Sequence, residues 1–138
     1  MSFLCYNYIM TKEDCVIYKG HFFQIEWYYN DNGESQPYEY FKLCDLSQKR
    51  KFLMLCQRIG DFGKIVDKTK FRFEGDDIFA FKPQPDRYLA FFIKGKKIIV
   101  TNAFRKKSDK MPRSEKNFAI KNREDYLRRN QNEEEDEK

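Results

Sequence analysis

The strongest constraint on the fold is a change of hydrophobic period close to residue 70. Before that point, Phe52, Leu55, Cys56 and Ile59 recur at the three- and four-residue spacing of an amphipathic helix. After it, apolar and charged residues alternate from 70 to 74, which is typical of a strand. Three more short apolar runs follow, at 78–82, 87–94 and 97–104. Turn residues separate these runs, so we predict an α+β domain with helices on one side of a curled antiparallel sheet.

One strand and two more helices are expected around this meander. Residues 21–29 alternate and predict a half-buried strand, and Pro37 can open a short helix that ends by Leu43. Asp45 and Gln48 have the spacing of a capping box at the start of the central helix, which Gly60 or Gly63 can end. A last helix is predicted over 114–129. Its expected buried residues are Phe118, Ala119, Tyr126 and Leu127.

The length of 138 residues fits one domain. We assign residues 1–20 to an N-terminal extension, 21–129 to the domain and 130–138 to an acidic disordered tail. No apolar run reaches the roughly 18–20 residues that a membrane span needs, and the N-terminus lacks the basic region of a secretory signal. We therefore expect a cytoplasmic protein that does not contact a membrane and whose thiols are reduced.

Several kinds of site are not expected. Cys5, Cys15, Cys44 and Cys56 form no CxxC pair, and His21 is the single histidine, so we predict no metal site and no catalytic serine triad. The phosphate-binding motifs GxxxxGK[ST] and GxGxxG are absent, which predicts that no nucleotide cofactor binds.

Positive charge is concentrated in the second half of the chain. Residues 64–113 contain 14 basic and 6 acidic residues, a net charge of +8. On the predicted sheet, Arg72, Lys82 and Arg87 share the face opposite the phenylalanines, and the sequence Arg105-Lys106-Lys107 follows the last strand. Such a cluster suits phosphate, and a lysine held among cations has a lowered pKa, as a general base requires. A solvated basic surface without a ligand is the alternative at this point.

The C-terminal half resembles the HigB-type, phage-derived branch of the RelE/ParE toxin superfamily. The resemblance depends on an ordered set of segments at 70–75, 78–82, 87–92, 103–107 and 119–126, with Pro112 before the last helix. It implies a RelE-like curled antiparallel sheet packed with two helices from the N-terminal half and one C-terminal helix. It also implies the toxin of a type II toxin–antitoxin pair, a metal-independent endoribonuclease that cuts mRNA on the ribosome, and a HigA-like helix-turn-helix antitoxin as partner.

Carried over to this sequence, the resemblance places Arg72, Lys82 and Arg87 in the catalytic site. Four more cations would contact RNA or the ribosome: Lys70, Arg105, Lys106 and Lys107. Where the superfamily has Glu-Leu-Arg, this chain has Ala80-Phe81-Lys82, and the site region has no histidine. Two alternatives therefore stay open: a non-enzymatic, ParE-like gyrase poison, and an inactive basic nucleic-acid-binding relative. An exposed aromatic patch for the antitoxin is also expected. The tyrosines between 28 and 40 are candidates for it, and packing in the core or a solvent-exposed aromatic fringe without a partner is the alternative for them.

Overall fold

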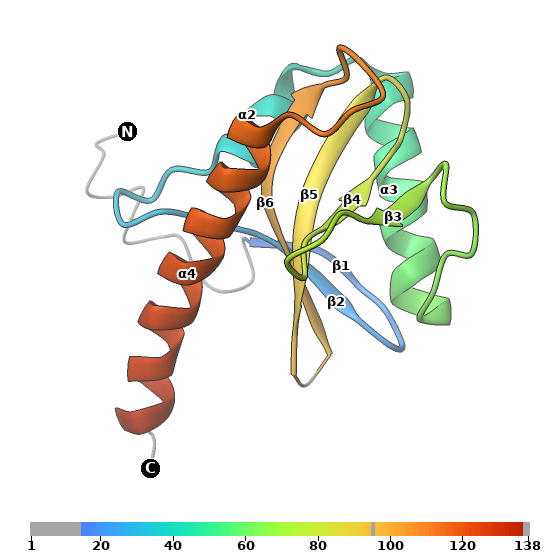
Figure 1. Cartoon of the computed structure of the whole chain (residues 1–138). Coiled ribbons are helices and arrows are strands. Elements are labelled where there is room, and N and C mark those ends of the chain that lie inside the picture. Colours follow the sequence, from blue (N-terminus) through green and yellow to red (C-terminus); the bar gives the residue numbers. More distant parts are fainter. Residues whose placement is uncertain (1–14, 95, 137–138) are drawn as a thin grey trace, which may run out of the picture.

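The computed structural model describes residues 15–94 and 96–136, and it has a six-stranded sheet with helices on both faces (Figure 1). The strands are β1 (Val16–Lys19), β2 (Gln24–Trp27), β3 (Phe71–Phe73), β4 (Phe79–Phe81), β5 (Asp86–Ile93) and β6 (Lys97–Arg105). The helices are α2 (Gln36–Leu43), α3 (Leu46–Phe62) and α4 (Arg113–Asp136). The α+β class is confirmed. Most of the expected N-terminal extension, Gly95 of the predicted β5–β6 turn and the last two residues of the expected tail lie outside the described residues.

The sheet is mixed, which corrects the prediction of an antiparallel sheet. Its strand order is β1-β2-β6-β5-β4-β3, and β3 to β6 form the predicted antiparallel meander. However, β2 pairs with β6 in the parallel direction. The long connection through α2, α3 and three strands brings the chain back beside β2 in the same direction, as parallel pairing requires. Residue alternation identifies strands but not their direction, and β1, which has no clean alternation, was not predicted.

The central helix forms as predicted. The side chain of Asp45 accepts from the N–H of Gln48, the side chain of Gln48 accepts from the N–H of Asp45, and Gly63 ends α3 in a left-handed conformation. All four residues of the predicted stripe are buried, and they pack with α2 on one face of the sheet. Cys44 and Cys56 are free thiols.

The last helix covers the opposite face, so the prediction of helices on one side was wrong (Figure 1). Ala119 and Tyr126 contact the sheet as expected, but Phe118 and Leu127 are 38% and 44% exposed. Asn122 is buried instead, and its Nδ2 donates to the Thr101 carbonyl at 3.0 Å. A polar residue is therefore part of the packed side of α4. This packed side is rotated around the helix axis relative to the predicted one.

The end of α4 also differs from the prediction, because the helix continues past Asn130 to Asp136. Glutamate and glutamine are good helix formers, and acidic charge alone does not end a helix. No helix in the described part of the chain is both long enough and apolar enough to cross a membrane.

Two glycines allow α3 to contact the turn between β1 and β2. A Cβ built on Gly20 would lie 2.2 Å from the carbonyl carbon of Gly60 in α3, and the Gly60 carbonyl accepts from Phe22 N at 2.7 Å. We expect Gly20→Ala to lower the free energy of unfolding by about 1–3 kcal/mol, because backbone must move to admit the methyl group. Urea unfolding of this variant beside His21→Ala, at an exposed neighbouring position, tests this. Equal midpoints for the two variants would contradict it.

Candidate functional site

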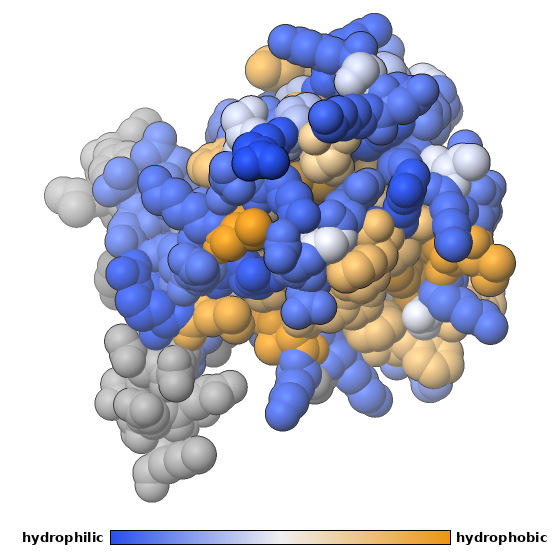
Figure 2. All heavy atoms as spheres, viewed as in Figure 1, coloured by the Kyte–Doolittle hydropathy of each residue, from blue (hydrophilic) through white to orange (hydrophobic). Residues whose placement is uncertain are grey.

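The strand register brings the three predicted catalytic cations to one face. Arg72 is opposite Ala80, and Ala80 is opposite Leu89, so these three residues share a face. Lys82 and Arg87 are each two residues along the chain from members of this set, which places them on the same face. Helix α4 covers the part of this face where Ala80 and Leu89 are buried. Figure 2 shows that hydrophilic residues cover the upper end of the molecule, where the segment 106–112 crosses the sheet in Figure 1.

Lys82 is partly buried among other charges. Burial lowers the pKa of its ammonium group, the carboxylate of Glu74 opposes this, and the charges of Arg87, Arg72 and Lys106 lower it further. The net direction is downward, so more of the amine is neutral near physiological pH than for an exposed lysine. This is the direction that the sequence analysis expected for a general base.

Arg87 is the most buried cation of the group, with 7% of its surface exposed. Its Nη1 donates to the carbonyl of Asp86 at 2.9 Å, which fixes the guanidinium against its own strand. Burial lowers its pKa, and the carboxylates of Glu74, Asp109 and Asp86 oppose this. Because the ordinary value is so high, the group stays charged, and it is a fixed cation suited to an anionic ligand.

The segment 106–112 between β6 and α4 forms one wall of a small pocket around these cations. The pocket is lined by Lys82 and Arg87 from the sheet and by Lys106, Lys107 and other residues of this segment. Lys106 Nζ lies 2.6 Å from Asp109 Oδ1, and this contact lowers the pKa of the Asp109 carboxyl, as do the charges of Arg87 and Lys82. The segment therefore brings cations to the site and holds one of them in place by an internal ion pair.

Glu74 is a site residue that was not predicted from the sequence. It lines the same pocket, and its charge acts on both Lys82 and Arg87. The signal was present, because Glu74 follows Arg72 at the two-residue spacing that keeps side chains on one strand face. This chain has Ala80 where the superfamily has a glutamate. The carboxylate of Glu74, directly after the adjacent strand β3, lines the pocket instead.

A constrained hairpin positions Glu74. The three residues after it, Gly75, Asp76 and Asp77, all have positive φ and belong to the hairpin that joins β3 to β4. Lys116 of α4 lies 2.8 Å from Asp76 Oδ2, and Arg123 donates to the Asp76 carbonyl. Helix α4 thus fixes the hairpin that carries Glu74.

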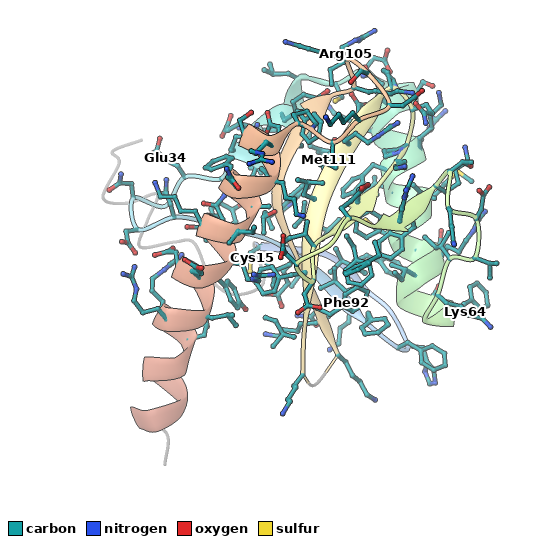
Figure 3. All side chains as sticks on the ribbon, in the orientation of Figure 1. Cys15, Glu34, Lys64, Phe92, Arg105 and Met111 are labelled. Atoms are coloured by element: carbon teal, nitrogen blue, oxygen red, sulfur yellow. The ribbon has the colours of Figure 1, made fainter. Side chains whose placement is uncertain are left out.

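The structure separates the predicted RNA-binding residues. Lys106 and Lys107 line the pocket, and Lys70 is exposed just before β3, where its carbonyl accepts from Lys82 N at 2.7 Å. Arg105 does not join the cations: it is opposite Asp86 in the sheet register, and its charge acts on the phenol of Tyr40 from α2. Its side chain is on the face of α2 and α3, because its register partner Asp86 accepts a hydrogen bond from Tyr40 of α2. Figure 3 labels Arg105 at the upper end of the molecule. The expectation that it converges with Lys82 is therefore wrong.

The profile of the phage-derived Gp49-like family (DUF891) matches residues 39–124, which is more than half of the chain. The chain belongs to the Gp49-like family. This is a phage-derived family of RelE/HigB-like toxins, which supports placing this Gp49-like protein in the toxin superfamily. The match begins within α2 and includes α3, β3 to β6 and the pocket with all its cations, whereas β1 and β2 precede it. No curated protein matches this Gp49-like chain significantly.

Proposed function

We propose that this Gp49-like protein is the toxin of a type II toxin–antitoxin pair and that it cuts mRNA on the ribosome. The observation that carries the proposal is the pocket in which Lys82, with its lowered pKa, and the buried guanidinium of Arg87 meet. Lys82, Arg87, Lys106 and Lys107 outnumber the carboxylates of Glu74 and Asp109 in this pocket, and the phosphodiester of RNA is an anion that such an excess of cations can bind. Membership in a toxin-like family supports the same conclusion.

The proposed chemistry uses protein side chains alone. The neutral amine of Lys82 accepts the proton of the 2′-hydroxyl, whose oxygen then attacks the adjacent phosphorus. Arg87 and Arg72 neutralise the pentavalent phosphate, and the bond from phosphorus to the 5′-oxygen breaks. A protonated lysine, for which Lys106 in the same pocket is the candidate, returns a proton to the 5′-oxygen. Glu74 offsets the repulsion between Lys82 and Arg87 and so holds the two cations close together.

The partners follow from the same assignment. The order of the motif segments supports a HigB-type toxin, and the family match supports the broader RelE/HigB-like superfamily. A HigA-like helix-turn-helix antitoxin would neutralise a toxin of this type. Lys70, Lys106 and Lys107 are the exposed or pocket-lining cations available to the mRNA backbone or ribosomal RNA. Phosphate contacts of this kind bind without reading sequence.

Inducible expression in a bacterium, with mapping of mRNA 5′ ends and a parallel DNA-damage readout, tests this function. We expect growth arrest with new 5′ ends at in-frame codon positions and no DNA damage. Arrest with intact mRNA and DNA damage would instead support a gyrase poison. Absence of arrest in cells that contain folded protein would support an inactive nucleic-acid-binding relative.

A further inference from the structure

A second concave surface lies on the α3 side of the sheet, at the edge that β3 forms, whereas the pocket of Lys82 and Arg87, here called the phosphate pocket, is on the α4 side. This groove has a volume of about 530 Å³ and is bounded by β3 and by the segment that follows α3. Its apolar lining includes Ile65, Val66, Phe71, Phe73, Phe79 and Phe92. Figure 2 shows apolar residues gathered over this side of the molecule, and Figure 3 labels Lys64 and Phe92 there. The tyrosines that were candidates for an exposed aromatic patch are buried or partly buried. The aromatic rings that line this groove are those of phenylalanines.

The phenylalanines of the groove form a connected row of rings. The ring centroids of Phe73 and Phe79 are 5.1 Å apart, and those of Phe79 and Phe92 are 4.8 Å apart. Phe73 at the outer end of this row is 53% exposed, although it lies on a strand. An aromatic ring that its neighbours hold in place and that remains open to solvent on one side can receive a stacked planar group.

The charged residues of the groove are all basic. Lys64, Lys68 and Arg72 line it, and no acidic residue does. Within residues 15–94 and 96–136, none of these three cations forms an ion pair with a carboxylate. Aromatic rings combined with unpaired cations are the pattern by which proteins bind single-stranded nucleic acid, with bases on the rings and phosphates on the cations. A groove for an apolar protein segment alone would not need this charge.

Arg72 connects the groove to the proposed cleavage site. It lines the groove, and its charge also acts on Lys82 in the phosphate pocket. We propose that this groove binds bases of single-stranded RNA that flank the cleaved phosphate, with Phe73 as the exposed stacking platform and Lys64, Lys68 and Arg72 on the backbone. The inference rests on the proposed function for the identity of the strand as mRNA, but the binding itself is measurable without cleavage.

Fluorescence anisotropy with two labelled probes tests the groove: a short oligoadenylate and an abasic ribose-phosphate strand of the same length. We expect the wild-type protein to bind the oligoadenylate more tightly. Phe73→Ala should weaken oligoadenylate binding about 5- to 100-fold and leave abasic binding unchanged, because one stacked base is lost while phosphate contacts remain. Phe73→Trp should keep the preference for bases. Phe118→Ala, which removes a 38% exposed ring on α4, is the matched control and should bind like wild type.

The outcomes separate the two proposals. Two results would overturn the proposal that the groove binds RNA bases: an oligoadenylate affinity that is unchanged in Phe73→Ala, or equal affinities of the wild-type protein for the two probes. If Phe73→Ala then lost antitoxin binding, the surface would be assigned to a protein partner. Base-dependent binding that is lost in Phe73→Ala supports base binding by the groove. This holds even if the wild-type protein leaves mRNA intact in cells, and in that case only the proposed nuclease function is wrong.

Discussion

Replacing Lys82 by methionine is expected to lower the rate of mRNA cleavage about 100- to 10,000-fold while the domain stays folded. This is the usual contribution of a positioned general base. Methionine keeps most of the aliphatic length of lysine and removes the amine, so the change tests chemistry rather than packing. Lys82 is partly buried at the end of β4 and forms no ion pair in the described residues, so the cost in stability should be small. Cleavage of ribosome-bound mRNA by purified protein measures the effect.

The pH dependence distinguishes a base from a fixed cation. If neutral Lys82 is the base, the cleavage rate rises with pH and levels off above the pKa of Lys82, and because that pKa is lowered the plateau begins below the range of an exposed lysine. If the ammonium form acts on the phosphate, the rate falls as pH rises through the same pKa. Lys82→Arg adds a second test, since arginine keeps the charge but does not lose its proton. The base assignment predicts that this variant is inactive.

Lys121→Met is the matched control, because Lys121 is an exposed lysine of α4 away from the pocket. It should cleave mRNA at the wild-type rate. Full activity in a folded Lys82→Met variant would remove Lys82 from the mechanism and direct attention to Glu74 and Asp109, the two carboxylates that line the pocket.

Local patterns predicted the parts of this fold that local interactions determine. The stripe on α3 and the capping box of Asp45 and Gln48 are encoded within a few residues, and both are confirmed. The parallel pairing of β2 with β6 and the position of α4 on the opposite face arise from contacts between segments far apart in sequence. Alternation and helical period contain no information on strand direction or on the face that a helix covers. These features could therefore not be read from one sequence.

The same distinction applies to the candidate site. The face shared by Arg72, Lys82 and Arg87 follows from strand alternation, so it was predictable once the meander was recognised. Arg105 was grouped with Lys106 because they are adjacent in sequence, although adjacent residues of a strand point to opposite faces. Glu74 had the correct spacing but was read as the polar side of a strand. Its relation to Lys82 and Arg87 appears only when β3, β5 and the segment 106–112 are brought together.

Replacing Phe52 by alanine should lower the free energy of unfolding by about 3–5 kcal/mol, the usual cost of removing a buried phenylalanine side chain. Phe52 of α3 is fully buried and stacks on Tyr88 of β5, with ring centroids 3.8 Å apart. Its ring also lies 5.7 Å from that of Trp27 and 5.6 Å from that of Phe81. Because three strands contact this one ring, little local collapse can fill the cavity. Urea unfolding followed by tryptophan fluorescence measures the loss.

Leu53→Ala is the control for this change, because Leu53 is the next residue of the same helix and is 40% exposed. It should cost far less, and equal losses for the two variants would contradict the central position of Phe52.

Tyr88 directly follows Arg87, so Phe52 supports the strand that carries the buried guanidinium from the opposite face of the sheet. Loss of Phe52 should therefore lower the folded fraction of the protein in cells, and cleavage per folded molecule should remain near wild type at low temperature. Lys82→Met should show the reverse, with stability retained and cleavage lost, so the two variants separate support of the fold from chemistry at the phosphate.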